Sequence, residues 1–227
     1  MAHLGKTITL KSGDGAEIDF YHVEAQGERK GGLVCVMEIF GVTDHIKDVC
    51  DAWAKEGYET VSPGIYDRQV RNFQSSYGQD DIQKSLKLRA ANNYDNTTMD
   101  VQTGIDFLKG RDAGPVYVTG YCYGGSIAWV AACRCTGLSG AACYYGGQVI
   151  EFIDEKPKCP TILHFGAHDE SIPMDDVRKI EAAHPDCPVY VYDAGHGFQS
   201  DRPTHYDEAA AKLAKERSLA HFAANRG

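Results

Sequence analysis

Residues 120–125 read Gly120-Tyr121-Cys122-Tyr123-Gly124-Gly125 and lie between an apolar run at residues 116–119 and an alanine-rich stretch at residues 126–132. The apolar run is typical of a buried strand, and the stretch that follows is typical of a helix. A sharp turn from strand to helix needs small residues two positions before and after its apex, and glycine occupies both positions here. The pattern therefore predicts a nucleophile elbow with Cys122 at its apex, where serine is more usual.

An elbow of this kind exposes the Cys122 side chain beside the N-terminus of the following helix. Backbone N–H groups and the positive end of the helix dipole favour a thiolate there, and they can stabilise an oxyanion formed by attack on an acyl carbon. A Gly-x-Cys-x-Gly string also arises by chance in a chain with 24 glycines and 8 cysteines. The flanking strand and helix, together with two downstream partners, favour acyl-transfer chemistry over chance.

The composition indicates an acidic globular protein. A chain of 227 residues is long enough for one sizeable core, and we expect a single α/β domain over residues 1–227. The net charge of −9 at pH 7 argues against nucleic-acid or anionic-membrane partners, which need clustered Lys and Arg. No run approaches the roughly 20 apolar residues that span a bilayer, and the N-terminal residues lack the apolar region of a signal peptide. The expectation is a soluble cytoplasmic protein, either monomer or homodimer.

Most of the eight cysteines fall inside apolar strands or helices, where a free thiol behaves as a small buried hydrophobe. A reducing compartment is therefore the simpler assumption. Cys133-Arg134-Cys135 has no matching second pair and no His-x-His partner, so the sequence does not favour a zinc site.

Short apolar runs alternate with longer helical stretches along the chain. We expect strands at residues 7–10, 17–23, 32–37, 58–62, 115–119, 140–143, 161–165 and 189–192, and helices at 44–55, 80–92, 96–109, 125–135, 175–183 and 204–224. This alternation predicts a twisted, mostly parallel sheet of about seven or eight strands with helices on both faces and no cap domain. Residues 67–81 fit no pattern, and we expect either a surface segment or mobile lid near the site or a plain surface loop.

Two residues downstream of Cys122 can complete a catalytic triad. Asp169 follows the strand at residues 161–165, and His196 follows the strand at residues 189–192, so both lie at the carboxyl edge of the sheet. The order nucleophile, acid, base is that of the α/β-hydrolases. Among nine histidines, only His196 lies between glycines directly after a strand, whereas His164 falls inside an apolar strand and fits a core position.

An additional carboxylate, Glu38, follows the strand at residues 32–37, where a hydrolase usually has oxyanion-hole backbone. By position alone, a surface carboxylate at a strand end is the simpler interpretation of Glu38.

Six segments together resemble the dienelactone hydrolase family, the carboxymethylenebutenolidases, and the likeness spans nearly the whole chain in order. The combination of Glu-Ile-Phe-Gly with Gly-Tyr-Cys is specific to that family within the α/β-hydrolase fold. The segments are Glu38-Ile39-Phe40-Gly41, Tyr66-Asp67-Arg68-Gln69, Gly120 to Gly125, Tyr144-Tyr145-Gly146, Gly166 to Pro173 and Gly195-His196-Gly197-Phe198.

This resemblance implies a triad of Cys122, His196 and Asp169, with Glu38 contacting the resting thiol and helping to deprotonate it. It also implies an oxyanion hole formed by the backbone N–H groups of Ile39 and Tyr123. The family opens an unsaturated enol lactone to maleylacetate. A thiolate suits that reaction because the released enolate is a good leaving group, and no metal or organic cofactor is implied.

The chain departs from the family at two arginines that bind the substrate carboxylate. The positions that match them fall near Ile82 and Ser200. Arg89 and Arg202 lie close enough in sequence to be substitutes, although long basic side chains are usually solvated. The substrate-binding candidates are Phe40, Arg68, Arg89, Tyr145 and Phe198.

The leading hypothesis is therefore a cysteine-dependent hydrolase that opens a dienelactone, or a related activated lactone or ester, through an acyl-enzyme on Cys122. A pocket without the two family arginines could instead take aryl esters, thioesters or organophosphates. An alternative from another class is a binding or redox-sensing protein with Cys122 as an oxidisable thiol. A sensor has no need of a base held by an acid, so Asp169 and His196 favour the enzyme.

Overall fold

Eight strands form one twisted sheet in the computed structural model, which describes residues 2–226. The strand order is β1-β2-β4-β3-β5-β6-β7-β8. Strands β3 to β8 run parallel, whereas β2 pairs antiparallel with both β1 and β4. The expected mostly parallel sheet is confirmed. The strands are β1 Lys6–Lys11, β2 Glu17–Val23, β3 Gly31–Val36, β4 Tyr58–Pro63, β5 Val116–Tyr121, β6 Gly140–Tyr144, β7 Thr161–Gly166 and β8 Val189–Tyr192.

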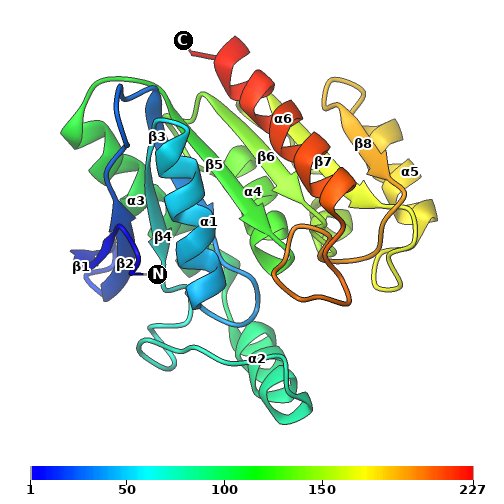
Figure 1. Cartoon of the computed structure of the whole chain (residues 1–227), viewed down its shortest axis with the longest axis horizontal. Coiled ribbons are helices and arrows are strands. Elements are labelled where there is room, and N and C mark those ends of the chain that lie inside the picture. The colour runs from blue at the N-terminus through cyan, green and yellow to red at the C-terminus, as the bar shows by residue number, and fades with distance from the viewer. Residues whose placement is uncertain (1, 227) are drawn as a thin grey trace.

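Helices cover both faces of the sheet, as expected. Figure 1 shows α1 and α6 in front of the strands, with α3 and α4 behind them. None of the helices within residues 2–226 is long and apolar enough to cross a membrane. The helices are α1 Asp44–Lys55, α2 Gln79–Ala91, α3 Tyr94–Arg111, α4 Tyr123–Arg134, α5 Met174–Ala183 and α6 Glu208–Ala224, with a 3₁₀ turn at Val149–Phe152.

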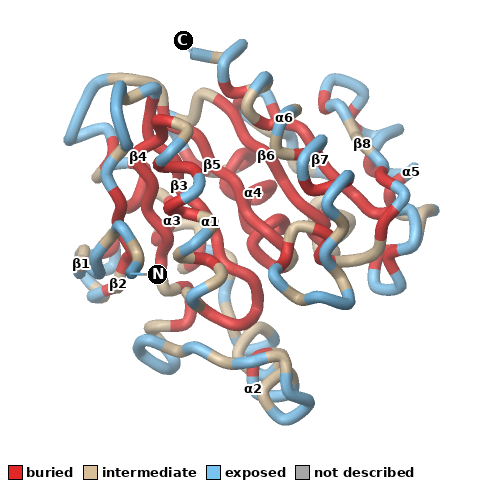
Figure 2. The backbone as a smooth tube through the Cα atoms, viewed as in Figure 1, coloured by how far each residue is buried: buried red, intermediate tan, exposed pale blue. Residues whose placement is uncertain are grey.

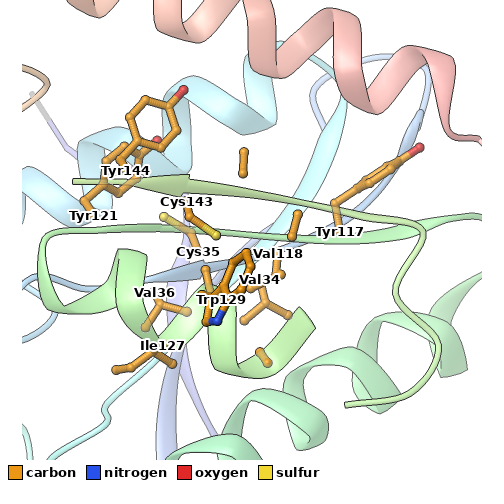
Figure 3. Close-up of a cluster of buried hydrophobic side chains, with 14 of the residues drawn as sticks. Val34, Cys35, Val36, Tyr117, Val118, Tyr121, Ile127, Trp129, Cys143 and Tyr144 are labelled. Atoms are coloured by element: carbon orange, nitrogen blue, oxygen red, sulfur yellow. The ribbon is translucent and has the colours of Figure 1, made fainter. Parts of the chain in front are cut away.

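The core lies on both faces of the three central strands β3, β5 and β6, whose residues are all buried. Figure 3 shows Tyr121 and Tyr144 on one face of these strands, with Ile127 and Trp129 of α4 packed on the other. Continuous apolar strands of this kind are typical of a parallel sheet covered on both sides. The cysteines also follow the expectation, since seven of the eight free thiols are buried and only Cys122 is half-buried.

The structure moves several predicted helix boundaries, and a side-chain cap explains two of the shifts. Helix α6 begins at Glu208 rather than at residue 204, because the Asp207 side chain accepts a hydrogen bond from the Ala210 N–H and caps the helix. Helix α3 begins at Tyr94 rather than at residue 96, because Asn93 accepts from the Asp95 N–H in the same way.

Residues 64–92, which lie between β4 and α3, contain the unpatterned stretch and helix α2, and we call them the α2 segment. Figure 2 shows it largely as exposed and intermediate tube below the buried sheet. Of the 13 residues of α2, only Ser85 is buried. The α2 segment is attached to the rest of the domain just after β3. There, Gln74 forms a β-bridge with Gly41, and the Ser75 N–H donates to the Phe40 carbonyl at 3.0 Å.

Candidate active site

Cys122 occupies the turn between β5 and α4 with φ 56° and ψ −119°, a backbone conformation that L-residues rarely adopt. The two flanking glycines explain how the turn closes. A Cβ at Gly120 would lie 2.0 Å from the Gly124 carbonyl oxygen, and one at Gly124 would lie 2.3 Å from the Val36 oxygen. The Cys122 N–H donates to the Tyr144 carbonyl at 3.1 Å and ties the apex to β6.

Asp169 and His196 meet at the same edge of the sheet. The His196 Nδ1 lies 2.7 Å from the Asp169 Oδ2. The other carboxylate oxygen of Asp169 accepts from the Ser171 and Ile172 N–H groups at 2.8 and 3.1 Å. Asp169 is only 8% exposed, so its carboxylate is held in place by three hydrogen bonds in a site nearly closed to water.

His196 carries the most informative pKa of the site. Burial alone would lower the pKa of this imidazole, but the charge of the Cys122 thiolate and the hydrogen bonds that the imidazolium donates to Asp169 and Cys122 outweigh it and raise the pKa to about 10. The imidazolium form of His196 is therefore favoured whenever Cys122 is a thiolate. A thiolate–imidazolium pair is the activated form of a cysteine nucleophile.

Glu38 lies two residues after β3 and is 5% exposed, so it is not a surface carboxylate. Burial raises the pKa of Glu38, while the nearby His45, His196 and Arg202 work in the opposite direction. Glu38 and Cys122 line the same pocket, and a carboxyl with a raised pKa holds a proton more readily than an ordinary one.

Ile39 and Tyr123, the predicted oxyanion-hole residues, are buried and both line the pocket that contains Cys122. Tyr123 is the first residue of α4, where helix N–H groups have no intrahelical acceptor. Within residues 2–226, neither the Ile39 nor the Tyr123 N–H donates to a backbone carbonyl. Both N–H groups are thus available to an oxyanion.

A pocket of about 740 Å³ opens at this edge of the sheet. Its lining combines the predicted catalytic groups with residues from the α2 segment and from the loop after β8. The lining residues used below are Glu38, Ile39, Phe40, Tyr77, Ile82, Leu86, Arg89, Cys122, Tyr123, Ile172, His196 and Arg202.

The five predicted substrate contacts divide into three groups. Phe40 and Arg89 line the pocket. Tyr145 and Phe198 are fully buried behind it, and the Tyr145 ring centroid lies 5.1 Å from those of both His196 and Phe198. These two rings pack behind the catalytic imidazole and do not line the pocket.

Arg68 lies away from the pocket, contrary to its predicted proximity. Its guanidinium is ion-paired with the fully buried Asp100 and, at 3.0 Å, with Asp14. The Ser12 hydroxyl donates to Asp100 at 2.7 Å and completes the cluster. A buried carboxylate without a cation would be unstable, so Arg68 has a structural role in joining the β1–β2 turn to α3.

From helix α2, sequence analysis named only Arg89 as a candidate for the pocket, and the contribution of Ile82 and Leu86 was not identified. Ile82, Leu86 and Arg89 have the spacing i, i+4, i+7 of a single helix face, and this periodicity was the available signal. Tyr77 and Arg202 also line the pocket, with the Arg202 guanidinium 5.2 Å from the centre of the Tyr77 ring. That contact joins two loops far apart in sequence and has no sequence signature.

His3, Asp48 and Asp51 form a cluster whose possible metal-ligating atoms all lie within 4.8 Å of one another. Asp51 already accepts from the Tyr21 hydroxyl at 2.6 Å and from the Leu4 N–H at 2.8 Å. None of these residues lines the active-site pocket, so this grouping has no place in its chemistry.

Comparison with known proteins agrees with this geometry. A sequence profile described as the Dienelactone hydrolase family matches residues 18–225. A Salmonella typhimurium protein provisionally named carboxymethylenebutenolidase is 32% identical over 209 residues, which cover 84% of this chain and 76% of that protein. The carboxymethylenebutenolidase of Pseudomonas putida is 29% identical over 197 residues, covering 82% and 83%. The crystal structure of a Klebsiella pneumoniae protein provisionally named dienelactone hydrolase superposes with a TM-score of 0.85 at 27% identity, covering 98% of this chain and 99% of that one.

Proposed function

The chain belongs to the dienelactone hydrolase family and is a hydrolase of lactones or esters, and we propose that it acts through an acyl-enzyme on Cys122. The proposal rests on one pocket that brings three features together. It is lined by the Cys122 thiol and by the His196 imidazole, which is hydrogen-bonded to Asp169 at 2.7 Å. It is also lined by Ile39 and Tyr123, whose backbone N–H groups have no backbone acceptor within residues 2–226.

In the first step, the Cys122 sulfur attacks the carbonyl carbon of the substrate. The N–H groups of Ile39 and Tyr123 stabilise the oxyanion, which is worth about 3 kcal/mol per donor in comparable sites. The ring C–O bond then breaks, and the enolate leaves with the electron pair. His196 protonates the leaving group where needed, because its imidazolium form is favoured beside the thiolate.

Acylation changes the electrostatics that favour the imidazolium. Cys122 becomes a neutral thioester, so the charge that raises the pKa of His196 disappears while the burial that lowers it remains. Neutral His196 can then take a proton from water, which attacks the thioester and releases the carboxylic acid. One imidazole thus serves as acid in the first half-reaction and as base in the second.

Glu38 is proposed to act on those enzyme molecules in which the Cys122 thiol is still protonated and the thiolate–imidazolium pair has not yet formed. Its buried carboxyl, with a pKa raised by burial, can accept the Cys122 proton when substrate occupies the pocket.

The substrate class we propose is a dienelactone or a related activated enol lactone or ester, in line with the family.

The test is steady-state turnover of cis- and trans-dienelactone and of p-nitrophenyl acetate by the wild type and by Cys122→Ala. We expect the variant to lose turnover of both kinds of substrate while its unfolding curve stays close to that of the wild type. Cys187→Ala is the matched control, because it removes another free thiol, one that lies outside the pocket.

Each outcome leads to a different conclusion. Lactone turnover that vanishes in Cys122→Ala supports the family reaction. Activity confined to p-nitrophenyl acetate would keep the thiol mechanism and move the substrate to neutral esters. Absence of Cys122-dependent turnover, with ready oxidation of Cys122 by peroxide, would replace the proposal with a redox-sensing function.

A further inference from the structure

The carboxyl of Glu38 is buried in the active-site pocket without a hydrogen-bond donor. Glu38 is 5% exposed, and within residues 2–226 no side chain or backbone N–H group donates to its oxygens. A carboxylate in such a place loses much of its hydration and is unstable unless positive charge lies close to it. The proposed function needs the ionised form, because only a carboxylate can take the proton of Cys122. The cations around Glu38 therefore decide whether this step occurs.

Three cationic side chains work against burial to lower the pKa of Glu38. His45 has the largest effect, followed by His196 and Arg202. The charge of His196 is favoured by the thiolate, so it is weakest in the molecules where the thiol still holds its proton. Arg202 and His196 both line the pocket, whereas His45 does not. The charge of His45 therefore acts on Glu38 from outside the pocket, whatever the pocket holds.

His45 is held at the start of helix α1. Its side chain is only 9% exposed, and its Nδ1 lies 3.8 Å from the Asp201 Oδ1. The chain reaches His45 from Glu38 through a tight turn, in which Gly41 has φ 89° and its carbonyl accepts from the Thr43 N–H at 2.9 Å. A nearly buried imidazole at ion-pairing distance from a carboxylate is favoured in its charged form.

Asp201 joins three parts of the chain at one oxygen atom. The Oδ1 that faces His45 also accepts a hydrogen bond from the Tyr77 hydroxyl at 2.5 Å. His45 belongs to α1, Tyr77 to the α2 segment and Asp201 to the loop after β8. The Asp201 side chain is 56% exposed, so water screens its charge, and it raises the pKa of Glu38 less than His45 lowers it. The His45–Asp201 pair thus acts on Glu38 as a net positive charge.

The other titratable groups around Glu38 do not replace His45. Burial raises the pKa values of Tyr77 and Tyr145 well above that of an ordinary phenol, so both stay neutral. The groups that surround the carboxyl are His45 from α1, Tyr77 from the α2 segment, Cys122 from the turn after β5, Tyr145 after β6, and His196, Asp201 and Arg202 after β8.

We propose that His45 is a positioning residue for Glu38. Its positive charge, held outside the pocket by Asp201, keeps the carboxyl ionised and able to take the thiol proton. The step moves one proton from the Cys122 sulfur to a Glu38 oxygen, leaves a thiolate and a neutral carboxyl, and breaks no other bond. This inference rests on the proposed function, because it concerns the group that deprotonates the nucleophile.

The direct test is a titration of Glu38 in Cys122→Ala, where no thiolate forms. Carbon nuclear magnetic resonance of protein labelled at the glutamate side-chain carboxyls follows the titration, and the signal missing in Glu38→Gln identifies Glu38. His45→Gln removes the positive charge and keeps a polar side chain. Because loss of a nearby cation disfavours the carboxylate, we expect the Glu38 midpoint to rise by about one pH unit.

Two further variants test whether the charge of His45 is the cause. His3→Gln is the matched control, because His3 is also paired with a carboxylate of α1, Asp44 at 3.2 Å, but lies outside the pocket lining. It should leave the Glu38 midpoint unchanged. His45→Lys keeps a positive charge at the start of α1 and should return the midpoint toward its wild-type value.

The pH profile of turnover distinguishes this role from a merely structural one. In the wild type, kcat/KM for p-nitrophenyl acetate should fall on the acid side as Glu38 takes up a proton. In His45→Gln, this acid limb should move to higher pH by the same amount as the Glu38 midpoint, with the plateau unchanged. A structural role would lower kcat/KM by one factor at every pH and leave the limb in place.

Asp201→Asn tests the part assigned to Asp201. Loss of its own negative charge would by itself move the Glu38 midpoint to lower pH. If Asp201 instead holds His45, its loss weakens the positive charge near the carboxyl, and the midpoint should move to higher pH, as in His45→Gln but by less. An unchanged midpoint or a shift to lower pH would contradict the holding role.

The inference is overturned if the Glu38 midpoint or the acid limb keeps its wild-type position in His45→Gln. It is equally overturned if His3→Gln gives the same shift, or if His45→Lys titrates like His45→Gln. The proposed function is judged separately by Cys122-dependent turnover of p-nitrophenyl acetate in the wild type. The Glu38 titration is measured in Cys122→Ala without any turnover, so either idea can fail alone.

Discussion

The carboxyl edge of the sheet and the α2 segment face the same pocket but are built differently. At the sheet edge, Cys122 is fixed by a strained turn between glycines, and Asp169 is fixed by three hydrogen bonds. In the α2 segment, residues 64–92, helix α2 has one buried residue and otherwise presents intermediate and exposed side chains (Figure 2). The sheet edge forms a rigid wall of the pocket because the core surrounds it. The α2 segment forms another wall and is a surface element.

This difference indicates that the sheet edge determines the chemistry and that the α2 segment determines substrate selectivity. Reacting groups need positions accurate to a fraction of an ångström, and buried strand ends supply that accuracy. Substrate-contacting side chains can change with little effect on the core when they project from an exposed helix. Changes at the sheet edge should therefore lower kcat or unfold the protein, and changes in the α2 segment should alter KM and substrate preference.

The largest expected effect is that of Asp169→Asn. An amide would bond His196 in the wrong tautomer and would not stabilise its imidazolium form, so kcat should fall by about a thousandfold or more with little change in KM. The control is Asp193→Asn, since Asp193 also contacts a histidine, His168, at 2.6 Å but both side chains are exposed. Equal losses in the two variants would contradict the special role of the sheet edge.

The second prediction concerns the proton on His196. In the wild type, the imidazole should titrate with a pKa of about 10. Cys122→Ser replaces the thiolate with a neutral hydroxyl, so the pKa should fall by more than one unit toward its ordinary value of about 6.5. Nuclear magnetic resonance of the ring protons follows both titrations, and a wild-type pKa near 6.5 would refute the ion pair.

The rigid wall is also the part that sequence predicted. Glycines two positions on either side of Cys122 and the order of Cys122, Asp169 and His196 are local signals, because strand ends and tight turns leave residue patterns. All eight strands were located to within two residues for the same reason. The resemblance to a known family then supplied the interpretation of Glu38.

The contacts made by the α2 segment were not predictable in the same way. Arg68 belongs to a motif shared with the family, yet its orientation depends on Asp100, a residue 32 positions away on helix α3. The contact between Arg202 and Tyr77 joins loops more than one hundred residues apart. Such pairings depend on how whole elements pack, which local periodicity does not encode.

The third prediction compares one glycine from each wall. In Gly120→Ala, the new methyl group would lie 2.0 Å from the Gly124 carbonyl oxygen, so the backbone must shift and the free energy of unfolding should fall by about 3 kcal/mol or more. In Gly78→Ala, at the start of α2, the nearest atom would be the Ser76 hydroxyl at 3.5 Å. That change should cost no more than about 1 kcal/mol. Urea unfolding of both variants tests the contrast, and similar losses would contradict it.

The smallest predicted effect concerns acid stability at the sheet edge. His164 lies in β7, five residues before Asp169, and burial lowers its pKa to about 3. Its ring nitrogens lie 2.8 Å from the Tyr192 hydroxyl and 3.1 Å from that of Ser218. Between pH 6.5 and 3, the unfolded chain binds a proton that the folded chain does not, so stability falls as the pH is lowered through this range.

At pH 4.5, the loss attributable to His164 should be about 2 to 3 kcal/mol relative to pH 7. His164→Gln has no titrating group there, so the stability difference between the two pH values should shrink by that amount in urea unfolding. His168→Gln, which removes an exposed histidine, should keep the full difference. If His164→Gln keeps the full stability difference between the two pH values, the acid sensitivity comes from carboxylates elsewhere in the molecule and His164 in β7 does not contribute to it.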